Sequence, residues 1–143
     1  ARVLAAMRRP GIGFHPAELS AGALALARRD TLGAIRILSM PDSVCLTLCP
    51  FVRFHLARLL SATRQDSAAA EIYEQNYTNI GIGKIMWMLD RGHVNERLGN
   101  TRRAIDSYAY VASAWQRADP ELKPYVDDAR RGLSALRSDP GRR

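Results

Sequence analysis

The sequence is poor in cysteine and has no long apolar run. Only Cys45 and Cys49 carry thiols, and no second cysteine pair completes the four ligands of a closed zinc site. If their segment is helical, their Cα atoms lie near the upper limit of disulfide geometry. No stretch approaches the ~20 consecutive apolar residues of a membrane-spanning helix. These absences disfavour a zinc site, a disulfide between the two thiols and a membrane span.

Motifs for catalysis are weak as well. Gly81-Ile82-Gly83-Lys84 resembles part of a phosphate-binding loop. However, Ile85 follows the lysine where Ser or Thr is needed, and Thr78 stands where the first glycine should be. We interpret the segment as a turn between helical units. No serine, cysteine or aspartate stands at a recognisable spacing from a base, so the sequence predicts no enzyme, no cofactor and no small-molecule substrate.

Small residues recur with a regular period. Ala34, Ala69 and Ala104 are equally spaced, since 69 − 34 and 104 − 69 are both 35. Each has a small residue twelve positions before it and a large one four positions after it, in the sets Gly22–Ala34–Leu38, Ala57–Ala69–Tyr73 and Gly92–Ala104–Tyr108. Two helices approach closely where one carries Gly or Ala and a large residue fills the gap. Each set therefore predicts a helical hairpin, and the period indicates stacked units.

The predicted hairpins have short polar turns between their helices. First helices are expected over 16–28, 51–63 and 85–98, and second helices over 31–40, 66–77 and 101–117. Pro16 suits a first helical position, and Gly99-Asn100-Thr101 ends one helix and caps the next. No stretch alternates apolar and polar residues for long enough to indicate a strand. The sequence therefore predicts an all-α fold.

These units resemble the tetratricopeptide repeat family, whose unit has a small residue in its first helix, Ala early in its second helix and an aromatic residue one turn later. The resemblance covers about residues 15–118 and is clearest at Gly92, Leu98-Gly99-Asn100 and Ala104-Ile105-Asp106-Ser107-Tyr108. The first unit has Leu38 where an aromatic residue is usual, and the early tryptophan is missing from all three units. The resemblance implies a right-handed superhelical solenoid of antiparallel helix pairs.

The register organises residues 1–143 as a single array. It assigns 1–10 to the remnant of a preceding helix, 15–48, 50–83 and 85–118 to three repeats, 120–137 to a capping helix and 138–143 to a tail. A lone second helix lacks a partner, so we expect a longer protein or a partner subunit upstream. The apolar face of the capping helix comprises Leu122, Val126, Ala129, Leu133 and Leu136. The C-terminal end also looks like the tails of bacterial tetratricopeptide repeat proteins.

The net charge of +7 is unevenly distributed. Residues 1–64 hold nine arginines and three acidic residues, whereas residues 65–143 hold twelve basic and eleven acidic residues. Only Lys84 and Lys123 are lysines, and a GC-rich bacterial genome is one explanation of this arginine richness. If the charge is functional, it favours an acidic protein, a phosphate-bearing partner or an anionic membrane surface.

The predicted function is a non-enzymatic scaffold for protein–protein interaction. In the family, first helices line a concave groove. The register assigns to it Leu19, Ala23, Leu26, Ala27, Phe51, Phe54, Arg58, Ser61, Met86, Leu89, His93, Glu96 and Arg97. Its principal candidates for partner binding are Leu19, Phe51, Phe54, Arg58, Met86, Leu89, His93 and Arg97. The resemblance thus implies a protein partner that docks an apolar or amphipathic helix or extended segment. The other interpretation of Phe51, Phe54 and Leu89 is packing against neighbouring helices or against an unseen upstream segment.

The expected setting is a peripheral subunit of a larger bacterial assembly or the C-terminal region of a larger protein. One alternative is an accessory subunit docked by its basic half on a membrane-bound, for example energy-transducing, complex. Another is a nucleic-acid-binding module that uses the Arg-rich N-terminal half, which is less favoured because only Phe51 and Phe54 interleave with the basic residues. The compartment is not determined beyond a soluble or peripheral protein, with the cytoplasm favoured.

Overall fold

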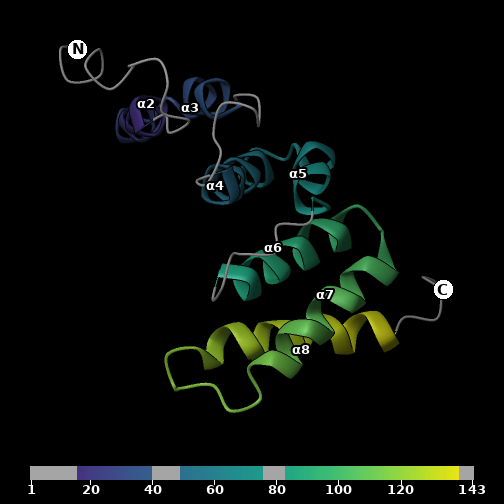
Figure 1. Ribbon diagram of the computed structural model, residues 1–143. Helices are drawn as coiled ribbons and strands as arrows, with labels where there is room; N and C mark the ends of the chain where they lie inside the picture. The colour runs from purple at the N-terminus through teal and green to yellow at the C-terminus, as the bar shows by residue number, and fades with distance from the viewer. Residues whose placement is uncertain (1–15, 40–48, 76–82, 139–143) are drawn as a thin grey trace. The chain divides into compact units, whose positions relative to one another are not determined.

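A computed structural model describes residues 16–39, 49–75 and 83–138. Over these ranges the chain is all-α, and its helices pack largely in sequential pairs (Figure 1). The seven helices of these ranges are α2 (Pro16–Ala27), α3 (Thr31–Leu38), α4 (Cys49–Ala62), α5 (Asp66–Tyr73), α6 (Gly83–Arg97), α7 (Thr101–Ala114) and α8 (Lys123–Ser138). The predicted all-α fold is confirmed for this part of the chain. None of these helices is long and apolar enough to cross a membrane.

The predicted helix starts agree with the structure better than the predicted ends. The starts expected at 16, 31, 66 and 101 are those of α2, α3, α5 and α7. The second helices are shorter than predicted, because α3 ends at Leu38, α5 at Tyr73 and α7 at Ala114. The capping helix begins at Lys123 rather than at 120, after a turn in which the Leu122 N–H donates to the Asp119 carbonyl over 2.9 Å. The predicted helical remnant at 1–10 lies outside the described residues.

The turns that follow α2, α4 and α6 repeat the period of the sequence. Arg29, Arg64 and Gly99 have φ of 61°, 62° and 74°, a left-handed conformation that is uncommon for residues other than glycine. In each case the next residue is the N-cap of the following helix, namely Asp30, Gln65 and Asn100. The small residues Ala34, Ala69 and Ala104 are all fully buried. Backbone conformation and burial therefore follow the same period as the sequence.

The chain divides into two compact units, Ala1–Thr63 and Arg64–Arg143, and each is described by itself. In the first unit, α2 packs against α3, and α3 packs against α4. Gly22 of α2 faces Leu38 of α3, and a Cβ atom added at Gly22 would lie 2.8 Å from Leu38 Cδ2. The Asp30 carboxylate caps α3 by accepting a hydrogen bond from the Gly33 N–H over 2.8 Å. The predicted small-to-large contact of the first hairpin is therefore confirmed.

In the second unit, Tyr108 of α7 is held between two glycines. A Cβ atom would lie 2.5 Å from its ring at Gly92 of α6 and also 2.5 Å from its ring at Gly132 of α8. The predicted pairing of Gly92 with Tyr108 is confirmed, and Gly132 is an addition that the repeat pattern does not indicate. Around this ring lies a core of Leu89, Ala104, Tyr108, Val111, Ala129 and Leu136. Three helices therefore meet at one aromatic side chain.

Trp87 joins α6 to α5 in the same unit. Its indole N–H donates to the Tyr73 carbonyl over 3.1 Å, and the two rings meet edge to face with centroids 5.1 Å apart. The two residues are buried. Since Ala57 and Ala69 belong to different units, the second predicted hairpin remains a prediction.

Candidate functional site

The residues predicted to bind a partner differ in environment along α4. Phe51 is 53% exposed. The Phe54 ring is half-buried, with its centroid 6.1 Å from that of His55. The Arg58 guanidinium carbon lies 5.6 Å from the centroid of the Phe54 ring, within the range of a cation–π contact. A predicted apolar anchor, Phe54, and a predicted charge, Arg58, therefore contact each other on α4.

An apolar groove lies within the first unit. Its volume is about 400 Å³, and it is lined by Ser20, Ala23, Leu26, Leu38 and His55. We call it the α2–α4 groove because these residues come from α2, α3 and α4. Two of them, Ala23 and Leu26, are residues that the register assigned to the concave face. Leu19 also lies in α2, but its side chain is outside the described part of the structure.

His55 was not predicted to line this groove. The family register selects Phe54 and skips the next residue, and a shift of one residue turns a side chain by about 100° around a helix. Leu38 is the large residue of the first hairpin, so a single side chain both fills the gap at Gly22 and faces the groove. The groove is therefore bounded by the contact that holds α2 to α3.

The first unit also exposes apolar and basic side chains outside the lining of the groove. Leu26 is 37% exposed and Leu24, on the same helix, is 42% exposed. Exposed arginines in the described part of this unit are Arg28, Arg29, Arg36 and Arg58. An apolar depression on a unit with exposed arginines can hold an apolar side chain of a partner that also carries acidic residues.

The predicted partner-binding residues of α6 have partners within the second unit. Leu89 is only 3% exposed and belongs to the core, and Met86 packs against that core. His93 Nε2 lies 2.8 Å from Asp128 Oδ2 of α8, and its ring is 5.6 Å from the Tyr108 ring. These side chains hold helices together in this structure.

Arg97 makes a two-pronged contact with Asp66 of α5. Its Nε and Nη2 donate to the two carboxylate oxygens over 3.0 and 2.6 Å. This hydrogen bonding lowers the pKa of Asp66 below its ordinary value, more strongly than the opposing effect of burial. The same contact raises the pKa of Arg97. The end of α6 is thus tied to the start of α5.

Arg91 lies at the centre of a polar network that the sequence pattern does not indicate. Its Nε and Nη2 donate to the Glu74 carboxylate over 3.1 and 2.9 Å, and its Nη1 donates to Ser107 Oγ over 2.7 Å. Burial raises the pKa of Glu74, but the hydrogen bonds and charge of Arg91 outweigh it, so that the pKa lies below its ordinary value. One guanidinium therefore links α5, α6 and α7.

Further hydrogen bonds of Asn95 and Tyr108 connect side chains within this unit. Asn95 is fully buried and donates to the Arg91 carbonyl over 3.0 Å, while its Oδ1 accepts from Asn100 Nδ2 over 3.1 Å. The Tyr108 hydroxyl donates to Glu96 Oε2 over 2.6 Å. Burial, followed by the Glu96 hydrogen bond, raises the pKa of Tyr108. Glu96, another residue that the register assigned to the groove, thus anchors the central aromatic ring.

Metal-binding side chains do not gather in the part of the chain that the structure describes. Within these ranges, no group of three or more His, Cys, Asp or Glu side chains is placed to hold a metal ion. Cys45 lies outside the described residues, and Cys49 is the first residue of α4. Gly81 and Ile82 also lie outside them, and α6 begins at Gly83. Comparison with protein-family models, curated proteins and solved structures finds no match for this chain.

Proposed function

We propose that this chain is a non-enzymatic protein-interaction module built from tetratricopeptide-like helical repeats, and that its partner docks in the α2–α4 groove. The observation that carries the proposal is the groove itself, about 400 Å³ of mainly apolar space in which Leu26 remains 37% exposed. Ligand pockets in proteins typically measure about 300–1,000 Å³ and are lined mostly by apolar side chains. The groove is therefore large enough to take an apolar anchor residue of a partner.

The repeat assignment is supported by features that depend on backbone geometry. The left-handed residues Arg29, Arg64 and Gly99 stand at the period of the small residues. Their neighbours occupy the N-cap position of the second helices, and Asp30 also caps its helix with its carboxylate. The solenoid arrangement, with first helices along a concave face, remains part of this proposal.

The partner that fits best is an amphipathic helix or extended segment with acidic residues beside its apolar ones. Apolar side chains would enter beside Leu26, and carboxylates would meet the exposed arginines of the first unit, including Arg58. Phe51 and the Phe54–Arg58 pair extend the candidate surface along α4. Aromatic and arginine side chains are common energetic centres of such interfaces.

The α6 residues are a second part of the predicted groove and contribute less to the proposal. Leu89 fills the core, and His93 and Arg97 have carboxylate partners within the unit. A partner would have to replace these contacts before it gained new ones, and losing a charge-assisted hydrogen bond costs about 1.5–3 kcal/mol. We therefore place the principal binding energy in the first unit.

Selection from a library of amphipathic peptides about 15 residues long, roughly four helical turns, tests this proposal. We expect the selected peptides to be acidic and to carry apolar residues at helical spacing. Leu26→Glu should weaken their binding by about 30-fold, because a carboxylate would replace an apolar contact worth about 2 kcal/mol. Leu24→Glu is the matched control, since Leu24 has a similar exposure on the same helix but does not line the groove.

Three results would count against the proposal. Equal loss of affinity in the two glutamate variants would mean that general charge, and not the groove, governs binding. Unchanged affinity in Leu26→Glu would place the peptide elsewhere. Binding that falls steeply with salt, together with binding of a nucleic acid, would favour the alternative use of the basic half, because neutralised phosphates release counterions.

The wider setting also stays a proposal. The exposed arginines are compatible with a peripheral subunit of a larger bacterial assembly, with the C-terminal region of a larger protein, or with an accessory subunit docked on a membrane-bound complex. Binding to vesicles containing anionic lipid, compared with neutral vesicles, separates membrane docking from protein docking.

A further inference from the structure

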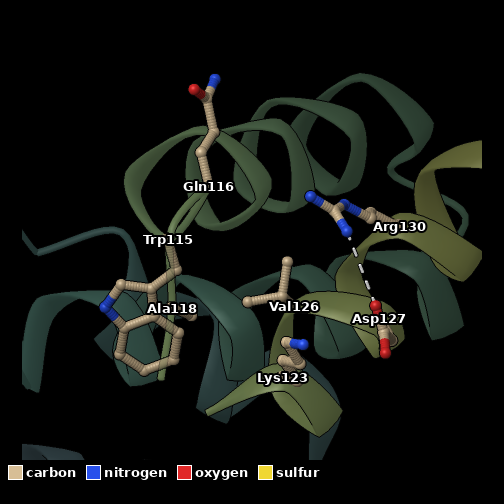
Figure 2. A pocket seen from close by; sticks show the side chains of 7 residues that line it. All are labelled: Trp115, Gln116, Ala118, Lys123, Val126, Asp127 and Arg130. Carbon is tan, nitrogen blue, oxygen red and sulfur yellow. Dashed lines mark ion pairs between the residues drawn. The ribbon is translucent and has the colours of Figure 1, made fainter. Parts of the chain in front are cut away.

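A pocket in the second unit lies where α7 ends and α8 begins. Its volume is about 270 Å³, and it is lined by Trp115, Gln116, Ala118, Lys123, Val126, Asp127 and Arg130 (Figure 2). We call it the Trp115 pocket. It shares no residue with the α2–α4 groove, and none of its residues belongs to the partner-binding set predicted from the sequence.

Backbone hydrogen bonds hold the two sides of this pocket. The Trp115 N–H donates to the Val111 carbonyl over 3.2 Å at the end of α7, and the Ala118 N–H donates to the Trp115 carbonyl over 3.2 Å. Across the turn, the Val126 N–H donates to the Leu122 carbonyl over 3.4 Å at the start of α8. The pocket is therefore formed by a local turn within one unit.

The lining combines one aromatic side chain with mostly polar and charged ones, and Val126 is buried. Figure 2 shows the Trp115 indole on one side, Arg130 and Asp127 on the other, and Val126 and Lys123 between them, while Gln116 points away. Trp115 packs against the core, and its ring centroid is 6.3 Å from that of Tyr125. Because contacts with the core and with Tyr125 hold the indole in place, its apolar surface is ordered before a ligand binds.

The charges of the pocket leave one cation in excess. Arg130 Nη1 lies 3.6 Å from Asp127 Oδ1, so that these two charges largely cancel. Lys123 is exposed, and no described residue forms an ion pair with it. A ligand with a single negative charge would gain from Lys123, while a cation would meet two positive side chains against one carboxylate. The pocket therefore favours a monoanion.

We propose that the Trp115 pocket binds a small aromatic carboxylate. The ring packs beside the Trp115 indole, and the carboxylate accepts hydrogen bonds from the Lys123 ammonium. The volume lies just below the usual range of about 300–1,000 Å³ for ligand sites and takes about one ring with a short chain. The same chemistry comes from a free aromatic acid or from a peptide that ends in phenylalanine. This is a binding site with no reaction assigned to it.

The two tryptophans of the chain provide a direct test. Trp115 lines the pocket, whereas Trp87 is buried and its indole N–H is bonded to the Tyr73 carbonyl. In the full chain, hydrocinnamate added in NMR titrations should shift the Trp115 indole N–H signal to saturation and leave that of Trp87 in place. Hydrocinnamamide, which has the same ring and no charge, should bind at least about five-fold more weakly, the loss expected for one charge-assisted contact.

Two variants connect the effect to the pocket. Lys123→Gln should raise the dissociation constant of hydrocinnamate about five-fold, because the ammonium is removed while the side chain keeps a similar length. Arg137→Gln is the control for net charge, since Arg137 is also exposed on α8 but does not line the pocket. It should leave the constant unchanged. Equal effects of the two substitutions would overturn the proposal.

The source of the ligand is decided by a comparison of hydrocinnamate with N-acetylglycyl-phenylalanine. Tighter binding of the peptide would assign the pocket to a chain terminus, and tighter binding of the free acid would assign it to a small aromatic acid. Either result supports the shared chemistry. Absence of a Trp115 shift with both probes, or equal affinity for acid and amide, would show that the pocket does not recognise aromatic carboxylates.

Discussion

The two units use similar helix pairs but present different surfaces. In the first unit, Leu24, Leu26, Leu32 and Phe51 are among the exposed apolar side chains, and a mainly apolar groove lies between helices. In the second unit, charged side chains of one helix meet those of another, as in Arg91–Glu74 and Arg97–Asp66. Under the proposed function, the first unit presents the contact surface, whereas the second is stabilised by its own polar contacts.

The contrast extends to how each hairpin fills its closest approach. Leu38 covers Gly22 with a flexible side chain in the first unit, whereas Tyr108 covers Gly92 with a rigid ring in the second. That ring is also enclosed by Gly132 and tethered to Glu96 by its hydroxyl. The same small-to-large pairing therefore gives a contact that can adjust in one unit and one that cannot in the other.

Replacing Gly22 or Gly92 by alanine should give the largest difference in stability between the two units. Gly92→Ala should lower the unfolding free energy of the second unit by about 1–3 kcal/mol, because the new methyl group meets a ring that has no room to move. Gly22→Ala should change stability by less than about 1 kcal/mol, since Leu38 can change rotamer and alanine favours a helix by roughly that amount.

The measurement is urea unfolding followed by two signals. Both tryptophans, Trp87 and Trp115, lie in the second unit, so fluorescence reports that unit, while far-ultraviolet circular dichroism reports all helices. Gly92→Ala should move the fluorescence transition to lower urea. If Gly22→Ala destabilises as much as Gly92→Ala, the two contacts are equally rigid and the contrast fails.

Removing the central guanidinium should have the next largest effect. Arg91→Met should destabilise the second unit by about 1–2 kcal/mol, because Glu74 loses two hydrogen bonds and the buried Ser107 Oγ loses a donor. Arg102→Met is the control, since Arg102 is exposed on α7 and should change stability by less than about 0.5 kcal/mol. Equal transitions for the two variants in urea would mean that the network contributes nothing measurable.

Acid should weaken the second unit through its paired carboxylates. The pKa values of Asp66 and Glu74 lie below their ordinary values of 3.8 and 4.5. Their stabilising contribution is therefore fully present above those ordinary values and is lost as pH falls through the lower values of the folded state. In Asp66→Asn, the unfolding free energy followed by fluorescence should depend less on pH below about pH 4. Asp106→Asn, an exposed substitution on α7, should leave this pH dependence unchanged.

Much of the helical plan could be predicted because it depends on residues that repeat. The period of small residues located the helix starts and the contacts of Gly22 and Gly92. Gly132 was missed because it belongs to the final helix, where no further repeat supplies a comparison. The early end of α7 was missed because Trp115 is apolar and continues the pattern, although its φ of −112° and ψ of 37° leave the helix.

The candidate site was harder to predict than the fold. The family register treats Leu89, His93 and Arg97 as surface residues, but contacts with α5, α7 and α8 decide their environments. Arg91 and Glu74 belong to no sequence motif, so their pairing depends on three-dimensional packing alone. His55 lies one position from a predicted residue. Periodic burial can be read from a sequence, whereas the partner of a particular charge cannot.

The most direct test is an amide chemical-shift map of the full chain with a selected acidic amphipathic peptide. The account predicts that the largest shifts fall within residues 20–38 and 51–58, which include Leu26, Leu38 and His55, and that α6 signals from 86–97 change little. Largest shifts along α6 and α8, with the α2–α4 groove unchanged, would contradict the assignment of the partner-binding surface to the first unit.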